Sequence, residues 1–355
     1  MRMSRRQFLL SAGAVGLDLV AGRAQADGAP QAAGPPARMV DFHTHLLGVG
    51  DGGTGCVISA KQRTHWNYRY FMTMIGHRPG GVVDDEYLAF LVHQLRSSAV
   101  SRALLQAWDC RYDDRGRMDL AHTTSLYVPN DYLFRVVKRH PALFIPCASI
   151  NPKRRDALDE VDRCAALGAR AVKVHPPTMA VDPGDRRYRA FYRRCAKRHL
   201  VLMVHTGTEH AADIVGNDWA DPARLRPALD EGGMVVAAHA GTRAFFDRED
   251  YFPHFRDLIG PYPNLYCDTA VLASMFRWRV LPEMLRDPRV VGRMIHGSDF
   301  PFASNALVFW NRLRPSDLVS IVAERNLFDR DWKLKRALGV PDTVLTRVGG
   351  LLKES

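Results

Sequence analysis

The stretch Met39-Val40-Asp41-Phe42-His43-Thr44-His45 is a short apolar run that ends in two histidines separated by one residue. Side chains alternate between the two faces of an extended strand, so His43 and His45 should share a face, and Asp41 should join them. Two imidazoles on one face at the end of a strand are the beginning of a metal site. Such pairs also occur on solvated strands, so the interpretation depends on further ligands elsewhere in the chain.

Seven more apolar runs follow this first strand, and helical patterns separate most of them. Continuous apolar strands that alternate with helices predict a parallel sheet covered by helices. Eight such units match a closed α/β barrel, a (β/α)8 TIM barrel, here with a C-terminal helical extension. An open doubly wound sheet is less favoured, because no glycine-rich phosphate loop follows the first strand. The later strands are predicted at 99–107, 143–150, 169–175, 200–205, 234–239, 264–268 and 290–296, with the tail 305–355 wholly helical and outside the barrel.

The N-terminus has the features of an export signal. Arg5-Arg6 precedes Phe8, a weakly apolar run follows, and 24–26 is a small-X-small cleavage pattern. We therefore predict a twin-arginine signal over 1–26, a flexible leader over 27–37, a catalytic domain over 38–353 and a periplasmic location. An ordinary secretory signal or a disordered tail is the alternative. The apolar run is too short and too interrupted for a membrane span.

The composition narrows the class of protein. The 355 residues are 46% hydrophobic and 25% charged, as in a globular chain with a full core. The net charge of +11 is spread in short arginine pairs, without an aromatic-interleaved basic block, which argues against nucleic-acid binding. Six scattered cysteines without a CxxC pair argue against a zinc ribbon or a redox site. We expect a small-molecule substrate, which a basic surface could attract if it is anionic, and we leave a homodimer open.

Histidines gather at the predicted strand ends, which open onto one face of such a barrel. Each histidine alone is more often an ordinary buried residue, but their joint placement favours a metal site. His43, His45, His205 and Asp299 can supply three nitrogens and one oxygen to one divalent ion, a set suited to zinc. The ion would lower the pKa of bound water towards about 7. His239 remains to exchange protons, since its ordinary pKa is about 6.5.

Other residues are candidates for contact with the substrate. The segment 48–82 is long, rich in glycine, aromatic and basic residues, and long loops in compact domains are usually functional. A strand-end lysine can become a carbamate that bridges two metals, but Lys173 more simply packs below the site or steers an anion. Asp268 should be a structural residue or support a ligand. The candidate substrate-binding residues are His175, Lys173, Arg63, Trp66 and Arg243.

Seven motifs follow one another along the chain: DFHTH (41–45), INPKRRDALDE (150–160), GARAVKVHPP (168–177), VLMVHTG (201–207), VVAAHAG (235–241), PNLYCDTA (263–270) and HGSDFPF (296–302). Together they resemble the amidohydrolase superfamily, in particular the branch of aminocarboxymuconate-semialdehyde decarboxylase and related metal-dependent hydrolases. The resemblance implies a (β/α)8 barrel with one zinc-like ion. It also implies first-strand ligands at 43 and 45, a fifth-strand ligand at 205, a group at 239 that orients or protonates the reacting group, and an aspartate at 299 that binds metal and moves a proton. The segment after the first strand is longer than in those decarboxylases, and the leader is unusual for the branch.

Three functions follow from this site. The first is a metal-dependent hydrolase, in which metal-activated water attacks a carbonyl, lactone or amide carbon. There Asp299 takes a proton and returns it to the leaving group, and His239 polarises the carbonyl. The second is a non-oxidative decarboxylase of a carboxylated aromatic or unsaturated substrate, which uses the same residues. The third is a metal-binding protein of the envelope without catalysis. The first is preferred, although fold and ligands do not by themselves determine the chemistry.

Overall fold

The computed structural model describes residues 34–36, 38–120 and 125–352. The predicted export signal and most of the leader lie outside the described residues, and the compact body of the chain begins at Pro36. Among the residues described, no helix is long and apolar enough to cross a membrane.

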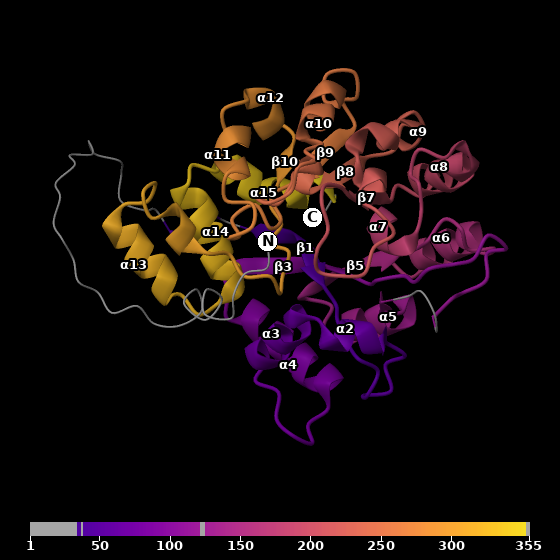
Figure 1. Ribbon diagram of the computed structural model, residues 1–355, viewed down its shortest axis with the longest axis horizontal. Helices are drawn as coiled ribbons and strands as arrows, with labels where there is room; N and C mark the ends of the chain where they lie inside the picture. The colour runs from indigo at the N-terminus through magenta and orange to yellow at the C-terminus, as the bar shows by residue number, and fades with distance from the viewer. Residues whose placement is uncertain (1–33, 37, 121–124, 353–355) are drawn as a thin grey trace. The chain divides into compact units, whose positions relative to one another are not determined.

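The body contains the predicted barrel of eight parallel strands (Figure 1). The first and last strands are joined where Phe42 N donates to His296 O at 2.9 Å and His45 N donates to Phe300 O at 2.9 Å. The strand order follows the chain, so all the strand C-termini lie at one end of the barrel. In that order the strands are β1 (Met39–His45), β3 (Val100–Gln106), β5 (Phe144–Ser149), β6 (Ala171–Val174), β7 (Val201–His205), β8 (Val235–Ala238), β9 (Leu265–Asp268) and β10 (Met294–Ile295).

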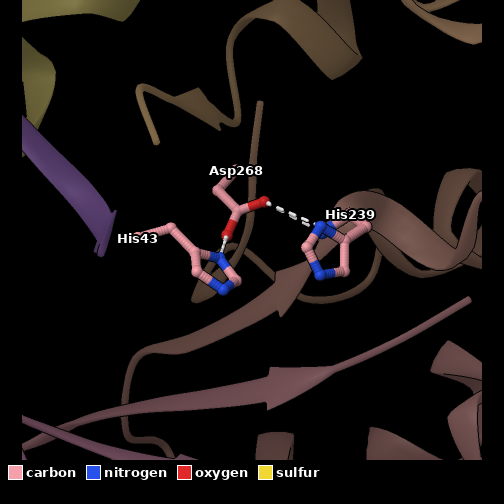
Figure 2. Close-up of side chains that lie close together, drawn as sticks. All are labelled: His43, His239 and Asp268. Atoms are coloured by element: carbon pink, nitrogen blue, oxygen red, sulfur yellow. Dashed lines mark hydrogen bonds and ion pairs between the residues drawn. The ribbon is translucent and has the colours of Figure 1, made fainter. Parts of the chain in front are cut away.

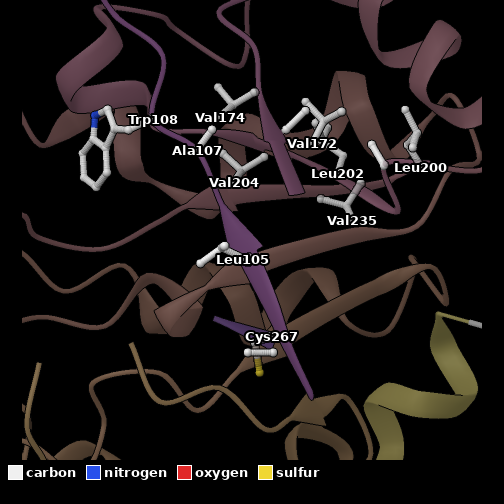
Figure 3. Packing of buried hydrophobic residues seen from close by; sticks show 14 of the residues in the cluster. Leu105, Ala107, Trp108, Val172, Val174, Leu200, Leu202, Val204, Val235 and Cys267 are labelled. Carbon is white, nitrogen blue, oxygen red and sulfur yellow. The ribbon is translucent and has the colours of Figure 1, made fainter. Parts of the chain in front are cut away.

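Helices surround the strands in Figure 1. Their apolar faces pack on the outward side chains of the strands, whereas the alternate side chains fill the barrel. Leu105, Val172 and Val204 belong to the outer layer, and Figure 3 shows them beside neighbours from other strands. The α-helices that follow the strands are α4 (Val83–Arg96), α5 (Asn130–Arg139), α6 (Ala157–Ala166), α7 (Pro176–Met179), α8 (Arg189–Lys197), α9 (Arg226–Leu229), α10 (Phe252–Leu258), α11 (Val280–Met284) and α12 (Pro288–Val291). Short 3-10 helices lie at Arg186–Tyr188, Asp218–Ala220, Pro222–Leu225, His239–Gly241 and Ala306–Phe309.

The segment 48–82 is more ordered than a long loop. It contains α2 (Ala60–Thr64) and α3 (Trp66–Met74), together with β2 (Val57–Ile58), which pairs with β4 (Leu126–Tyr127). Each helix has a side-chain cap: Ser59 accepts from Gln62 N at the start of α2, and His65 accepts from Asn67 N at the start of α3. Side chains of both helices, Gln62 and Asn67, donate to the carbonyl of Ala211 in the loop after the strand that ends at His205. The segment therefore still stands at the face where substrate selection is expected.

The C-terminal tail differs from the prediction in two respects. It is not wholly helical, because loops separate α13 (Pro315–Ala323), α14 (Leu327–Ala337) and α15 (Asp342–Leu351). Its last helix is also not outside the barrel: Val348 and Leu352 pack with the interior side chains Val40 and Phe42, and α15 contacts β1 and β10. The helix therefore closes the end of the barrel opposite the strand C-termini.

The last predicted strand was too long. Val290 and Val291 belong to α12, which starts with Pro288 after the capping side chain of Asp287. Proline at the first helical position and an aspartate before it favour a helix start over a strand. Only Met294 and Ile295 form the β10 ladder.

Candidate metal centre

A group of buried imidazoles lies where the C-terminal ends of the strands meet. The ring centroids of His43 and His45 are 5.1 Å apart, and His239 lies 5.0 Å from His43. His205 lies 4.9 Å from His239 and stacks on His175 at 3.9 Å. None of the five is more than 5% exposed. The parallel topology therefore brings together histidines that are far apart in the sequence.

Asp299 lies between the two histidines of the first strand. Its Oδ1 atom is 3.0 Å from His43 Nε2 and 3.1 Å from His45 Nε2. These three side chains offer ligand atoms within 4.8 Å of one another. The backbone at Asp299 has φ of +68°, an unusual conformation for a residue with a Cβ. This conformation carries the carboxylate from the end of β10 to the end of β1.

Asp268 at the end of β9 orients His43, and Figure 2 shows its carboxylate between the rings of His43 and His239. Its Oδ2 atom is 2.7 Å from His43 Nδ1, and its Oδ1 atom accepts the backbone amides of His239 at 2.9 Å and Ala270 at 3.2 Å. A carboxylate that receives Nδ1–H leaves the Nε2 lone pair of His43 for the site, which is the usual support of a ligating histidine.

The strand register changes the role of Asp41. Val40 and Phe42 point into the barrel, and the pairing with β3 shifts between Asp41 and Thr44, a stretch that includes His43. The prediction that Asp41 shares their face is therefore wrong. Its carboxylate accepts His43 N at 2.8 Å and Ser298 N at 2.9 Å, so it supports the backbone beside the site.

His205 lies in a second group rather than beside Asp299. Its Nε2 atom is 3.7 Å from Glu209 Oε2, which is 3.2 Å from His175 Nε2. These three residues also offer ligand atoms within 4.8 Å of one another. His205 Nε2 is buried without a hydrogen-bond partner among the described residues, so it is available to a ligand. The predicted set of four ligands is thus divided between two adjacent groups, and it stays a prediction.

The electrostatics give His45, His239 and Asp299 protonation states suited to metal binding. Burial and Lys173 would lower the pKa of His43, but Asp299 and Asp268 raise it above its ordinary value. Burial lowers the pKa of His45 to about 4 and that of His239 to about 3. Burial alone would raise the pKa of Asp299, but the nearby His43 and His45 hold it well below its usual range. Neutral imidazoles and an ionised carboxylate are the forms that bind a metal ion.

The residues present therefore fit a small divalent cation. Nitrogen and oxygen ligands converge, His43 has an orienting carboxylate, and the buried His205 Nε2 has no hydrogen-bond partner among the described residues. Lys173 Nζ lies 3.3 Å from His43 Nε2, and burial lowers the pKa of this lysine. It is close enough to reach a group bound beside His43.

The remaining predicted substrate residues lie farther out. Arg63 is exposed and its Nη1 donates to Tyr68 Oη at 3.3 Å. Arg243 bonds to the Asp247 carbonyl and lies 3.6 Å from the Asp250 carboxylate, so its guanidinium is engaged within its own loop. Trp66 is 43% exposed and lies 6.2 Å from the Phe276 ring. Their contact with substrate stays a prediction.

Sequence reasoning missed two charged residues near the histidines. Glu209 follows His205 by four positions, and the hydrogen bond with His175 helps to outweigh burial and lowers its pKa to about 2. Arg277 is 6% exposed and follows β9 in a segment without a recognisable motif. Its Nη1 atom donates to Thr242 O and Oγ1, and its Nη2 atom donates to Thr208 O at 2.6 Å. Only the spacing from His205 could have indicated Glu209.

One surface hollow lies away from the clustered histidines. It has a volume of about 390 Å³ and is lined by Pro253, Arg256, Asp257, Gly260 and Arg289, none of which is near the histidines. We assign it no role.

Solved structures with the same barrel were found at low sequence identity. One is an uncharacterised TIM-barrel protein from Bordetella bronchiseptica, with 16% identity, 85% of this chain and 99% of that chain covered, and a TM-score of 0.52. A second is a putative 2-pyrone-4,6-dicarboxylic acid hydrolase from Pseudomonas putida (15% identity, 89% and 97% covered, TM-score 0.54). A third is a 5-carboxyvanillate decarboxylase from Sphingomonas paucimobilis (13% identity, 89% and 97% covered, TM-score 0.51). At this identity they show a shared fold.

No curated protein matches the chain. The family model described as amidohydrolase does match, over residues 40–307, which is more than half of the chain and runs from the first strand past Asp299. This enzyme family usually binds a metal, and the grouped histidines and aspartates agree with that property. The protein therefore belongs to the amidohydrolase family.

Proposed function

We propose that this protein is a zinc-dependent hydrolase of a carbonyl, lactone or amide substrate. The observation that carries the proposal is the position of Asp299, whose Oδ1 atom lies within 3.1 Å of Nε2 of both His43 and His45. A carboxylate in this place can contribute to metal binding and still exchange a proton with the reacting group.

Asp268, His239 and Asp299 have different roles in the proposed reaction. A bound divalent ion would supply Lewis-acid chemistry and make water more acidic. Asp268 holds His43 with Nε2 directed at the site. His239 Nδ1 donates to Ala270 O at 3.1 Å, so the neutral ring has a lone pair at Nε2. This atom must gain a proton before it can polarise or protonate the substrate. Asp299 accepts a proton from water and returns it to the leaving group.

Decarboxylation is the second candidate, and Arg277 is the observation that favours it. No carboxylate oxygen of the described residues lies within 4.0 Å of this buried guanidinium, and Glu209 and Asp299 act on it only at longer range. Three of its five N–H groups have acceptors, which leaves two donors. A carboxylated substrate would supply the missing anion.

Product analysis separates these functions. The zinc-loaded protein would be incubated with aromatic esters, lactones and carboxylated phenols in water labelled with heavy oxygen. A hydrolase places the label in the product, whereas a decarboxylase releases carbon dioxide and leaves the other product unlabelled. Binding of zinc without turnover of any member of the panel would contradict both in favour of a binding protein. The His239→Ala variant is the control for turnover at this site.

We also propose that the protein is exported to the periplasm by the twin-arginine route. The support is the Arg5-Arg6 pair with the cleavage pattern at 24–26. Replacement of both arginines with lysine should leave uncleaved precursor in the cytoplasm, as judged by fractionation. Undiminished export of that variant would reject the proposal. A homodimer stays a prediction.

A further inference from the structure

A buried ion pair lies on α14, outside the residues that match the family. Lys335 is 0% exposed and Asp331 is 2% exposed, and Lys335 Nζ lies 2.5 Å from Asp331 Oδ2. Two charges removed from water are costly to accommodate, so their other contacts matter. Ser304 Oγ donates to Asp331 Oδ1 and satisfies the second carboxylate oxygen.

The lysine reaches the strand end that carries Asp299. Lys335 Nζ donates to the carbonyl of Gly297 at 2.7 Å, two residues before Asp299. The approach to the first strand is close here, because a Cβ on Gly297 would stand 2.8 Å from the Cβ of His43. The cation of a tail helix therefore contacts the backbone directly behind the candidate metal centre.

Asp41 also holds the backbone around Gly297 and Asp299. Its Oδ2 atom accepts Ser298 N at 2.9 Å, and its Oδ1 atom accepts His43 N at 2.8 Å. Asp299 N in turn donates to His43 O at 2.9 Å. Gly297 N also donates to Thr269 Oγ1 at 3.3 Å, so the segment 297–299 is fixed at one carbonyl and three amides, just where Asp299 adopts its positive φ.

The buried pair has a neutral neighbour. His296 lies between Asp41 and Asp331, with its Nε2 and Nδ1 atoms 3.7 Å and 4.0 Å from the respective carboxylates. Neither ring nitrogen has a hydrogen-bond partner among the described residues. Lys335 is consequently the group that neutralises Asp331 in this region.

We propose that Lys335 and Asp331 are positioning residues for the carboxylate of Asp299. By fixing the Gly297 carbonyl, the ion pair holds the left-handed turn that directs Asp299 towards His43 and His45. A conformation of this kind persists only where its surroundings determine it. The inference rests on the proposed function in treating Asp299 as a ligand, but the position of the turn can be measured without metal.

The test removes both charges together. The double variant Asp331→Asn/Lys335→Met keeps the side-chain sizes and avoids an unpaired buried charge. The matched control is Lys333→Met on the same helix, whose Nζ pairs with Glu324 at 2.5 Å and does not contact Gly297. Three quantities would be measured on the full chain: hydrogen exchange of the metal-free protein, zinc affinity by chelator competition, and the visible spectrum of the cobalt-loaded protein.

In the double variant we expect the amides of 298–300 to exchange at least ~10-fold faster and zinc to bind ~10-fold or more weakly. The spectrum of the cobalt-loaded protein should also shift. Loss of the groups that orient metal ligands typically has effects of this size on metal sites. The Lys333→Met control should match the wild type in all three. Unchanged exchange and affinity in the double variant would overturn the proposal. Unchanged exchange with weaker zinc binding would also overturn it, because the turn would then be independent of the pair.

Two outcomes, an unfolded double variant and a wild type that binds no zinc, require a further variant or a separate interpretation. If the double variant does not fold, Ser304→Ala removes only one hydrogen bond of Asp331, and we expect a smaller change in the same direction; wild-type values for that variant would overturn the proposal. If the wild type binds no zinc, the proposed function fails, while faster exchange at 298–300 in the double variant would still support the positioning role.

Discussion

Replacement of Asp268 with asparagine tests how the site orients its first ligand. Asp268 is fully buried and accepts three hydrogen bonds: one from His43 Nδ1, and one each from the amides of His239 and Ala270. An asparagine cannot replace all three. If its NH₂ group faces His43, the imidazole must move its proton to Nε2 and loses the lone pair directed at the metal. If its oxygen faces His43, its NH₂ group meets two backbone N–H donors.

The expected loss of zinc affinity follows from the hydrogen bond between Asp268 and His43 that the substitution removes. A buried hydrogen bond with a charged partner contributes about 1.5–3 kcal/mol. At about 1.4 kcal/mol for each factor of ten, Asp268→Asn should weaken zinc binding by about 10- to 100-fold. This agrees with the usual effect of removing the carboxylate behind a ligating histidine.

The assay is competition for zinc against a chelator, with thermal unfolding of the metal-free proteins to confirm folding. Asp109→Asn is the matched control, because Asp109 is also buried and accepts backbone amides, from Cys110 at 2.8 Å and Asn151 at 2.7 Å, but contacts none of the clustered histidines. Equal zinc affinities of Asp268→Asn and the control would refute the orientation argument.

Other predictions concern the ligands and the stability of the fold. Asp299→Ala should deplete zinc and abolish activity, whereas His239→Ala should abolish activity with zinc retained; loss of zinc from the second variant would contradict the role of His239. Burial by itself raises the pKa of Glu160, but hydrogen bonds from Arg163 and Asn130 outweigh it, and the pKa lies below its ordinary value of 4.5. Stability from these bonds is therefore present above pH 4.5 and is lost as the pH falls through the lower folded-state value. Urea unfolding across this range should show a smaller pH dependence for Glu160→Gln than for the wild type; an identical dependence would exclude Glu160 as its source.

Much of the fold was predictable because its signals are local. The apolar runs locate all eight strands, and an alternation of strands and helices implies parallel pairing. The start of β10 was mispredicted because valines fit a strand as well as the helix that starts at Pro288. The last helix was misplaced because an amphipathic pattern shows that a face is buried, not which end of the barrel buries it.

The candidate site was predictable where a residue's place on its strand is sufficient. His43, His45 and His239 stand at strand ends, and parallel topology brings such ends together whatever the loops do. The sequence could not show the turn at Asp299, the shift of register that redirects Asp41, or the association of His205 with Glu209.

The sequence by itself therefore determined the barrel, the order of its strands and the histidines at their ends, since these depend on periodicity and chain order. Only the tertiary structure decided which atoms meet. Asp268 supports His43 across 225 positions, and Lys335 reaches Gly297 from a helix beyond the family match. Such contacts have no local pattern, because a buried charge is placed by the packing of distant segments and the need to satisfy every polar atom removed from water.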